Sequence, residues 1–581
     1  MANSNLQSVT SSKCDPCICR GLKEFRFFNL KQKWASMGKP WFNSYAEGVS
    51  HYLDYEEITM SDCLTRVAKN HPNTIGLIYF KTKIKFREFD QMVNRMANAL
   101  IDLGVKPGDK VSLLLPNVPQ VAIAAYAVWR IGAIVVMNNP LYTDVELEHQ
   151  FNDSESTFLI TLDLLGPRML ALKPKTAIKT IIVAHIRDYL SFPLKQLFPL
   201  VAKDKHRDIP KQQGVYEWLD LMKKYPADNP NISVDFRAIA ALQYTGGTTG
   251  VSKGVVLTHS NLSKNCQQGL AWIYNMKPGE SIVLGSLPIF HAFGLFTLNM
   301  CVRGVWSIVL IPRPEAEFIM EAIHKNKVNL FPGVPTMFIG ILNHPKLKDY
   351  NLSSLKICVS GAAPCPVDVI KRFEAMSGAQ IVEGFGISEA SPATSINPVG
   401  GINKPGSIGL PLSDTEVKIV DLDDRNKELP ANEAGELCIK GPQVSDLGYY
   451  KMPEETKETF VDGWLYTGDI AKIDDDGYTF IVDRKKDMII AGGYNIYPRD
   501  IDEVLFTHPK IAEACTKGVA DEYRGETVKA FIVLKEGEVL TKQEVIDFCK
   551  EKLAAYKVPK IVEFMDELPK SAVGKILRKD L

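Results

Sequence analysis

The feature that most constrains the fold is an alternation of apolar runs, rich in valine and isoleucine, with helix-like segments from about Thr74 to Leu410. For example, Gly108–Leu115 predicts a strand and Pro119–Ile131 predicts the helix that follows it. Such alternation is typical of α/β layers built on largely parallel sheets. From Gly406 to about Asp483 the pattern changes to short strands and turns, which predicts a small β-rich subdomain.

The length of the chain, 581 residues, exceeds what one hydrophobic core usually supports. We place a domain boundary at the charged run Asp483–Asp487, after which strands and helices alternate again. A run of this kind also suits a solvated turn, and the two interpretations are compatible. The predicted α/β organisation has three parts: an N-terminal extension of residues 1–40, expected to be disordered; a large N-terminal domain of residues 41–485 with layered α/β subdomains and the small β-rich subdomain; and a small, mobile α+β C-terminal domain of residues 486–581.

Charge and hydropathy exclude some classes of protein. The chain has 68 basic and 68 acidic residues, which gives no indication of nucleic-acid binding. Its most apolar stretch, Val118–Met137, is interrupted by Pro119, Arg130 and Gly132, and predicts a buried helix followed by a strand rather than a membrane span. The N-terminus shows no secretory signal, so we expect a cytoplasmic protein.

Eleven cysteines are scattered along the chain, an odd number that does not suggest a disulfide framework. We expect most of them to be buried thiols. Cys14, Cys17 and Cys19 form a C-x2-C-x-C cluster that could ligate zinc or an iron–sulfur centre if a fourth ligand came from elsewhere. Alternatively, Met37 rather than Met1 is the true start of the protein, and this cluster belongs to a spurious extension.

A loop rich in glycine and hydroxyl groups, Thr245–Gly254, lies between two apolar segments. Main-chain N–H groups and hydroxyls of such a loop can wrap a polyphosphate. It is not a Walker A loop, because Val251 and Ser252 separate Gly250 from Lys253 and a strand follows. We expect the next helix only after Ser260, as its N-cap. An ordinary glycine turn is the alternative, but the density of donors exceeds what a turn requires.

The segment Tyr244–Gly254 resembles the signature loop of the acyl-adenylate-forming (ANL) superfamily, which includes acyl-CoA synthetases, luciferases and peptide-synthetase adenylation domains. The resemblance covers roughly residues 40 to 581. Further motifs agree in order and spacing, namely Leu287–His291, Ser360–Pro364, Glu383–Glu389, Tyr466–Asp469, Asp483–Asp487 and the segment that ends in Lys575.

Two stretches, Asp462–Asp469 and Val482–Ile489, are similar to the signature of fatty acyl-CoA synthetases, in particular bacterial long-chain fatty acid–CoA ligases. Ser388 stands where threonine is usual, and Tyr466 stands where histidine is common. The resemblance implies that a fatty acid attacks the α-phosphorus of ATP and releases pyrophosphate. The thiol of coenzyme A then attacks the acyl-adenylate and releases AMP. The implied substrates and cofactors are ATP, Mg²⁺, coenzyme A and a long-chain fatty acid.

The resemblance also implies roles for individual residues, with residues 41–485 forming the AMP-binding domain. Thr245 and Glu389 would position Mg²⁺, and Lys575, Glu389, Thr245 and His291 would be the catalytic residues. Nucleotide-binding positions would be Thr245, Gly246, Gly247, Thr248, Thr249, Gly250, Lys253, Gly361, Ala362, Ala363, Glu383, Gly384, Phe385, Gly386, Ser388, Asp469, Arg484 and Lys575.

A moving C-terminal domain would let one cleft serve both half-reactions. Lys575 would bridge the carboxylate and the α-phosphate during adenylation. Rotation about Lys486 would then withdraw Lys575 and bring Gly492, Gly493 and Tyr494 to the coenzyme A side. A surface lysine on a tail is the alternative for Lys575.

The acyl group would lie beside His291, in a tunnel lined by Trp272 and by Val334–Ile339, although packing in the core is an alternative for His291 and Trp272. The segment Tyr189–His206 combines apolar and basic residues. It suits either peripheral contact with the inner membrane surface or packing on its own domain. The sequence leaves the oligomeric state open, a homodimer included.

Three other functions stay open from the sequence. A ligase for aryl or medium-chain acids would share the ATP motifs, because tunnel residues cannot be read from spacing. An adenylating domain could pass the acyl group to a carrier protein, although the chain contains no appended carrier domain. A non-catalytic nucleotide-binding module would tolerate changes at Lys575.

Overall fold

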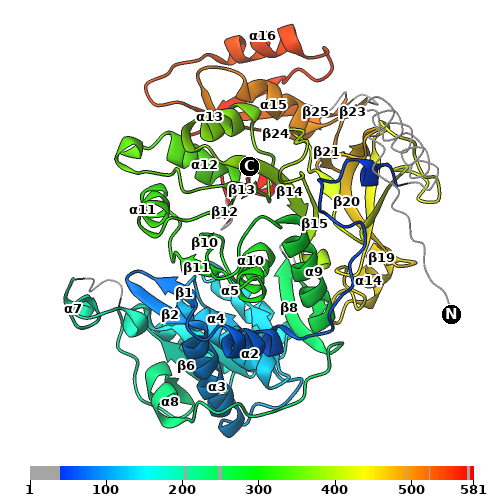
Figure 1. Ribbon diagram of the computed structural model, residues 1–581. Helices are drawn as coiled ribbons and strands as arrows, with labels where there is room; N and C mark the ends of the chain where they lie inside the picture. The colour runs from blue at the N-terminus through cyan, green and yellow to red at the C-terminus, as the bar shows by residue number, and fades with distance from the viewer. Residues whose placement is uncertain (1–38, 202–205, 246–251, 492–493, 522–523, 572–575) are drawn as a thin grey trace, which may run out of the picture.

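A computed structural model describes residues 39–201, 206–245, 252–491, 494–521, 524–571 and 576–581. These residues form four sheets, three in the larger part of the chain and one in the C-terminal part. Figure 1 shows the sheets with their covering helices, and the C-terminal elements β24, β25, α15 and α16 lie together at one end of the molecule. The predicted class, a large α/β part followed by a smaller α+β part, is confirmed.

The first sheet has seven strands, and all of its neighbouring pairs are parallel except β8 with β9. In spatial order its strands are β7 (Val215–Glu217), β6 (Thr180–Ala184), β5 (Phe158–Leu162), β3 (Lys110–Leu114), β4 (Ile134–Met137), β8 (Ile239–Thr245) and β9 (Lys253–Thr258). Helices of this region are α2 (Met60–Asn70), α3 (Phe86–Asp102), α4 (Pro119–Arg130), α5 (Asp144–Asp153), α6 (Gly166–Leu172), α7 (Leu194–Val201) and α8 (Trp218–Lys224).

The second sheet has nine strands, parallel in the middle and antiparallel toward both edges. Its order is β16 (Leu410–Pro411), β15 (Ala393–Ile396), β14 (Gln380–Gly386), β13 (Ile357–Ser360), β12 (Leu330–Gly333), β10 (Ile282–Gly285), β11 (Ser307–Leu310), β1 (Ile75–Tyr79) and β2 (Thr82–Lys85). Its helices are α9 (His259–Trp272), α10 (Ala292–Arg303), α11 (Ala316–Asn326), α12 (Pro335–Leu342) and α13 (Val367–Ser377).

One continuous apolar core joins these two sheets. It includes Val111 and Leu113 of β3, Val283 of β10 and Leu330 of β12, together with the whole apolar face of α4. Every residue of α4 is buried, as is β4 after it. A helix that is apolar all round must lie inside the protein, so the prediction of a buried helix and strand for Val118–Met137 is confirmed. No helix within the described ranges has the length and apolar character needed to cross a membrane.

The start of α9 differs from the prediction. The N-cap is Thr258, the last residue of β9, rather than Ser260. The Thr258 hydroxyl accepts a hydrogen bond from the Asn261 N–H, and the Asn261 side chain accepts one from the Thr258 N–H. This reciprocal capping box satisfies two main-chain donors, so the chain turns directly from strand to helix.

The third sheet contains the short strands that the sequence predicted as a β-rich subdomain. It comprises β17 (Glu416–Val420), β18 (Gly435–Lys440), β20 (Trp464–Ile473), β19 (Phe460–Val461) and β21 (Thr479–Arg484), with α14 (Pro453–Thr459) beside it. The fourth sheet comprises β23 (Tyr494–Ile496), β22 (Ile489–Ala491), β25 (Gly525–Leu534), β24 (Ile511–Asp521) and β26 (Ile561–Phe564), with α15 (Pro498–Phe506) and α16 (Lys542–Lys552).

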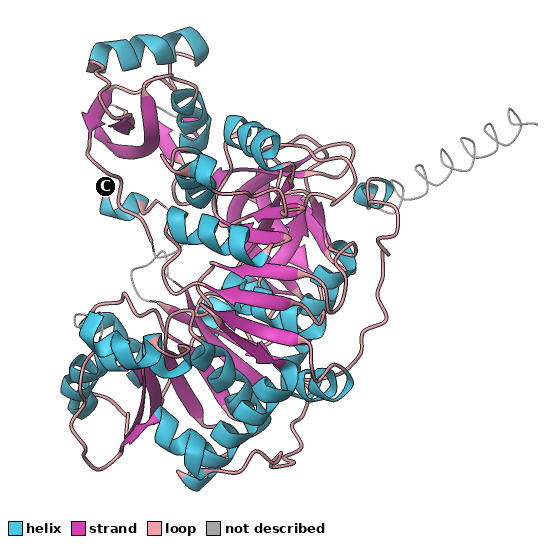
Figure 2. Cartoon of the chain, turned by 60° about the vertical axis from the view of Figure 1, so that its left-hand side comes forward, coloured by secondary structure: helices cyan, strands magenta, loops and turns pink. Residues whose placement is uncertain are grey.

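The C-terminal part has a hydrophobic core of its own, drawn from residues between Ile489 and Phe564. The chain changes sheet between Arg484, which ends β21, and Ile489, which begins β22. This interval contains Lys486, where a boundary was predicted from the sequence, and the boundary itself stays a prediction. Figure 2 shows the C-terminal part at one end of the molecule, with the C-terminus between it and the larger body.

The eight cysteines within the described ranges are all buried free thiols. This confirms what the sequence predicted for most of the cysteines. Cys14, Cys17, Cys19 and Met37 lie outside the described residues.

Candidate active site

One large cavity, with a volume of about 2730 Å³, is lined by residues from all four sheets. Of the site residues predicted from the sequence, it is lined by Thr245, Lys253, His291, Gly361, Ala362, Ala363, Glu383, Gly384, Phe385, Gly386, Ser388, Glu389, Asp469, Arg484 and Lys486. The fold therefore gathers into one space residues that are separated by more than two hundred positions in the sequence.

Other predicted positions lie outside the described residues, namely Gly246, Gly247, Thr248, Thr249, Gly250, Gly492, Gly493 and Lys575. Thr245 ends β8 and Lys253 begins β9, and these two residues pair across the antiparallel hairpin. The predicted loop therefore connects two paired strands, as the sequence indicated, and not a strand and a helix. Tyr494 begins β23, where its main chain pairs with Ala491.

Main chain forms one wall of the cavity where β13 and β14 end. Gly361 follows β13, and a Cβ atom added there would lie 2.9 Å from the Phe293 ring, so a larger residue would displace that ring. Ala362 has a φ of 65°, a left-handed conformation that is uncommon for alanine. At Gly386 an added Cβ would meet the Pro392 carbonyl oxygen at 2.5 Å. A glycine is therefore required at 361 by the Phe293 ring and at 386 by the close approach of the Pro392 backbone.

Glu383 holds two of these segments together. Its carboxylate accepts hydrogen bonds from the Cys365 N–H at 3.1 Å and the Gly406 N–H at 2.7 Å. Burial raises the pKa of Glu383, and the two N–H donors oppose that rise. These bonds support a role in shaping the cavity wall.

Glu389 lies in the short 3-10 turn Ser388–Ala390, beside a tyrosine that the sequence analysis missed. The Tyr449 hydroxyl donates to Oε1 of Glu389 at 2.8 Å. Burial raises the pKa of Glu389, and the hydrogen bond from Tyr449 opposes the rise. The Lys253 ammonium lies 5.3 Å from the centre of the Tyr449 ring, which orients the ring as well. No motif marked Tyr449, because its partners are distant in sequence.

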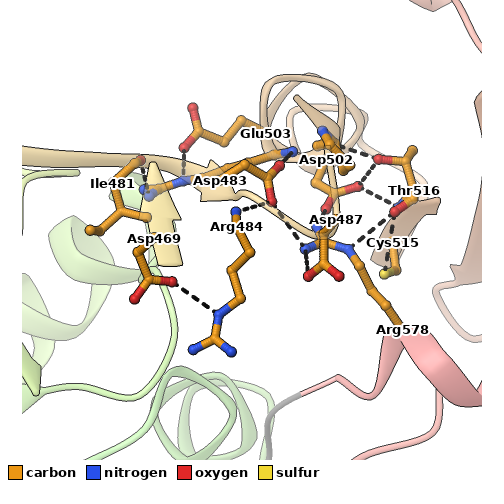
Figure 3. Close-up of polar contacts among 12 residues, drawn as sticks. Asp469, Ile481, Asp483, Arg484, Asp487, Asp502, Glu503, Cys515, Thr516 and Arg578 are labelled. Carbon is orange, nitrogen blue, oxygen red and sulfur yellow. Dashed lines mark hydrogen bonds and ion pairs between the residues drawn. The ribbon is translucent and has the colours of Figure 1, made fainter. Parts of the chain in front are cut away.

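Asp469 and Arg484 lie opposite each other on the neighbouring strands β20 and β21. The Arg484 Nε atom is 3.0 Å from Oδ1 of Asp469, and the Asp469 side chain is buried. Strand pairing thus fixes an acidic and a basic group that the sequence places in separate motifs (Figure 3). Lys486 lies just beyond, and partial desolvation lowers the pKa of its ammonium.

A cluster around Arg578 ties the C-terminal tail to the interval between the third and fourth sheets (Figure 3). Its guanidinium lies 2.6 Å from the Asp502 carboxylate and 3.6 Å from the carboxylates of both Asp483 and Asp487. Its Nε donates to the Thr516 carbonyl at 3.1 Å. Burial alone would lower the pKa of Arg578, but the carboxylates outweigh it and raise that pKa. No sequence motif marked this residue, although it follows Lys575 by three positions.

The cavity also has an apolar end, lined by one face each of two helices. From α9 it is lined by Gly269, Trp272 and Ile273, and from α10 by Phe293, Phe296, Thr297 and Met300, which follow helical spacing. Trp272 is also packed in the core, with its Nε1 3.3 Å from the Ser413 hydroxyl. Pro335, Thr336 and Ile339 of α12, within the predicted range Val334–Ile339, line the same cavity. His291 is the N-cap of α10, and its Nδ1 accepts from the Phe293 N–H at 3.4 Å.

The sequence pattern of the AMP-binding enzyme family matches residues 64–450, and that of the AMP-binding enzyme C-terminal domain matches residues 500–575. The chain belongs to the AMP-binding enzyme family. A long-chain-fatty-acid–CoA ligase of Bacillus subtilis is 44% identical over 549 residues, which cover 94% of this chain and 97% of that protein. A long-chain-fatty-acid–CoA ligase of Escherichia coli is 36% identical over 94% of this chain and 98% of its own length.

Among solved structures, the anthranilate CoA ligase AuaEII in complex with anthranoyl-AMP has a TM-score of 0.80 and 28% identity, over 89% of this chain and 95% of that chain. The resemblance that the motifs indicated, to acyl-adenylate-forming enzymes, is therefore confirmed for nearly the whole chain. The cavity is lined both by main chain and by carboxylates that are held in place. This combination suits an enzyme that binds AMP.

Proposed function

We propose that this AMP-binding enzyme is a long-chain fatty acid–CoA ligase that uses ATP and Mg²⁺. The acid would attack ATP to give an acyl-adenylate and pyrophosphate, and coenzyme A would then take the acyl group and release AMP. The observation that carries the proposal is the single cavity whose polar end, at Glu389 and Asp469, is continuous with an apolar end between α9 and α10. A charged nucleotide and an apolar acyl chain need such adjoining environments.

At the polar end each group has a role that suits its chemistry. The loop Thr245–Gly250 and Lys253 would bind the β- and γ-phosphates, and Ser388 would contact the α-phosphate. Gly361–Ala363 and Gly384–Phe385 would enclose adenine. Asp469 would accept hydrogen bonds from the ribose hydroxyls, with Arg484 holding its carboxylate in place.

Thr245 and Glu389 would hold Mg²⁺. A hydroxyl and a carboxylate are hard oxygen donors, and Mg²⁺ is bound by one or two such groups together with phosphate and water. Both residues line the cavity, and one oxygen of Glu389 is held by Tyr449. When bound, the ion neutralises charge on the phosphates.

Residues 486–581 would act as a mobile domain that rotates about Lys486. Lys575 would contribute to adenylation, and Gly492, Gly493 and Tyr494 would serve the coenzyme A step after rotation. The contacts of Arg578 support this proposal, because Asp483 belongs to β21 whereas Asp502 belongs to α15, on the two sides of Lys486. Rotation would separate the first contact and retain the second.

A preference for long chains rests on the apolar end of the cavity and on the names of the relatives. An aryl or medium-chain acid is the second candidate, which the similarity to an anthranilate CoA ligase favours. Transfer to a carrier protein is less favoured, because the relatives named above are CoA ligases.

The test is pyrophosphate release by the purified protein with ATP, Mg²⁺ and acids from acetate to oleate and coumarate, each with and without coenzyme A. We expect turnover that is stimulated by coenzyme A and is highest with long acyl chains. A maximum with aryl or short acids would support the proposed reaction but contradict the proposed long-chain substrate. Absence of release with every acid would contradict the proposal and favour a nucleotide-binding module.

The two half-reactions can be separated with Lys575→Ala. We expect adenylation to be nearly abolished, while attack of coenzyme A on supplied acyl-adenylate is spared, because only the first geometry would use this lysine. Lys552→Ala, an exposed lysine on α16, is the matched control. Equal loss in both half-reactions would contradict rotation of the C-terminal domain.

We also propose peripheral contact with the inner face of the cytoplasmic membrane through the segment around α7. Phe192 has an exposed fraction of 82%, and Leu194 and Leu197 are exposed beside it. Apolar side chains next to Lys195 suit an anionic lipid surface. Flotation with phosphatidylglycerol vesicles should recover the protein, and Phe192→Ser should reduce the recovery. Recovery of neither protein would favour packing of this segment on its own domain. Equal recovery of both would favour membrane contact through another surface.

A further inference from the structure

A cluster of histidine and carboxylate side chains lies at the carboxyl edge of the seven-stranded sheet. Asp163 follows β5, His185 follows β6, and Glu217 ends β7, and these three strands are parallel neighbours. His206 lies in the chain beyond α7. The carboxyl ends of parallel strands meet at one edge of a sheet, so the fold brings these groups together. None of the four is among the described residues that line the active-site cavity.

Two imidazoles converge on one buried carboxylate. Nδ1 of His185 lies 3.0 Å from Oδ2 of Asp163, and Nδ1 of His206 lies 2.9 Å from the same oxygen. One ligand atom from each of the three residues lies within 4.8 Å of the others. The Asp163 side chain is 1% exposed and the imidazoles are 11% and 13% exposed. Two nitrogen donors and one oxygen donor therefore share a small, nearly water-free space.

One carboxylate oxygen of this cluster has no partner in the part of the chain that the structure describes. Oδ1 of Asp163 is buried and has no hydrogen-bond partner among the described residues, whereas Nδ1 of His185 has its ion-pair contact with Oδ2 of Asp163 at 3.0 Å. Buried polar atoms in proteins are nearly always paired. A bound cation beside the two imidazoles would give this buried carboxylate oxygen the partner that it lacks.

The outer nitrogens of both imidazoles are held by carboxylates. Nε2 of His185 lies 2.9 Å from the Glu217 carboxylate, and Nε2 of His206 lies 3.2 Å from the Asp208 carboxylate. A carboxylate on the far nitrogen fixes the tautomer in which the near nitrogen can bind a metal, and it is the usual arrangement around metal-binding histidines. The Arg207 N–H in turn donates to Oδ2 of Asp163 at 2.9 Å.

We propose that Asp163, His185 and His206 bind a divalent transition-metal ion, Zn²⁺ in particular, with Glu217 as the carboxylate that orients His185. Zn²⁺ prefers two or more nitrogen ligands with a carboxylate and accepts water in a remaining position. Around a tetrahedral ion with bonds of about 2.0–2.1 Å, neighbouring ligand atoms lie about 3.3 Å apart. The two nitrogen–oxygen distances, 2.9 and 3.0 Å, are slightly shorter than that spacing, and all three ligand atoms lie within 4.8 Å of one another.

The position of the site suggests what the ion does. The segment between His185 and His206 carries α7 at the outer edge of the molecule (Figure 1). The ion would join the ends of β5 and β6 to the chain that returns from α7. It would thus anchor both ends of the segment that carries α7, independently of the proposed ligase activity.

The test is metal binding by the full-length chain, purified without a histidine tag and treated with a chelator. Cys14, Cys17 and Cys19 are changed to serine in this background, because that thiol cluster could bind zinc itself. Zn²⁺ is titrated by calorimetry in the absence of ATP and Mg²⁺, and Co²⁺ is used as an absorption probe of coordination. We expect one equivalent of Zn²⁺ and a higher Tm when it is bound.

Variants assign the binding to these residues. Asp163→Asn keeps the shape of the side chain and should abolish Zn²⁺ binding and the Tm shift, as should His206→Gln. Glu217→Gln should weaken the affinity about tenfold to a hundredfold. His71→Gln, an exposed histidine outside the cluster, should bind as the parent does. Circular dichroism and pyrophosphate release verify that each variant is folded.

Absence of Zn²⁺ and Co²⁺ binding by the parent would overturn the proposal and leave the cluster as ion pairs between two imidazoles and Asp163. Retained binding in Asp163→Asn or His206→Gln would overturn it as well. Failure of the ligase assay with an intact Zn²⁺ response would refute the proposed function alone.

Discussion

The polar end of the cavity is lined by short loops that follow strands, whereas its apolar end is lined by one face each of α9 and α10. At the polar end, strand pairing and main-chain hydrogen bonds fix Asp469 and Glu383. At the apolar end, side chains such as Phe296 and Met300 occupy space without polar partners that would fix them. A change at the polar end should therefore affect the reaction with every acid, and a change at the apolar end should affect which acid is used.

Glu389→Gln is expected to have the largest effect. The substitution removes the negative charge proposed to hold Mg²⁺ while it keeps the size of the side chain, so adenylation should fall by about a hundredfold or more. Pyrophosphate release measured with several acids should fall by the same factor for all of them. Glu454→Gln, an exposed position on α14, is the control. A loss confined to long-chain acids would contradict the division of the cavity.

Arg578→Met should have the next largest effect, because it leaves Asp502 and Asp483 as buried carboxylates without their cation. Removal of one partner from a buried ion pair typically costs about 3 kcal/mol or more, and we expect about 2–3 kcal/mol for this partly exposed group. Urea unfolding of the C-terminal part and the rate of adenylation would both be measured. Arg372→Met, which breaks an exposed pair with Asp368, should change neither. If the rate of adenylation is unchanged in Arg578→Met, the cluster around Arg578 does not contribute to the reaction at the polar end of the cavity.

Gly269→Ala tests the apolar end. The added Cβ would lie 2.6 Å from the Phe296 ring and 2.9 Å from the Met300 sulfur, so both of these cavity-lining side chains would have to move. We expect kcat/KM for oleate to fall about tenfold, with little change for medium-chain acids. Gly340→Ala adds the same methyl group to α12, where the nearest atom is 3.7 Å away. An equal fall for all acids would show that the two ends are not independent.

Tyr449→Phe should have the smallest effect, a shift in the pH dependence of kcat/KM. Burial raises the pKa of Glu389 above its ordinary value, and the Tyr449 hydroxyl opposes this rise by stabilising the carboxylate. Without the hydroxyl the pKa of Glu389 rises further, so the ionised form is reached only at higher pH. The acidic limb of kcat/KM should move upward by up to about one pH unit.

The control for this shift is Tyr450→Phe, whose hydroxyl contacts the exposed Glu155. A limb that stays in place, or that moves to lower pH, in Tyr449→Phe would show that Glu389 does not control the profile.

Much of the fold could be predicted from local sequence. The mostly apolar stretch Val118–Met137 predicted α4 and β4 correctly, because such a segment is most stable in the core. The N-cap of α9 was misplaced, because Thr258 and Ser260 are both good caps. Only the continuation of β9 to Thr258 and the bond with Asn261 decide between them.

Contiguous motifs by themselves determined the family, and they named many of the residues that line the cavity, since each motif carries its chemistry within a few positions. The tertiary structure alone decided the partners of those residues. Tyr449 reaches Glu389, Arg578 reaches Asp502, and His185 reaches Asp163 only because sheets and turns bring distant segments together. No local pattern encodes such pairs, because the energy of each contact depends on burial and on distances that exist only in the folded chain.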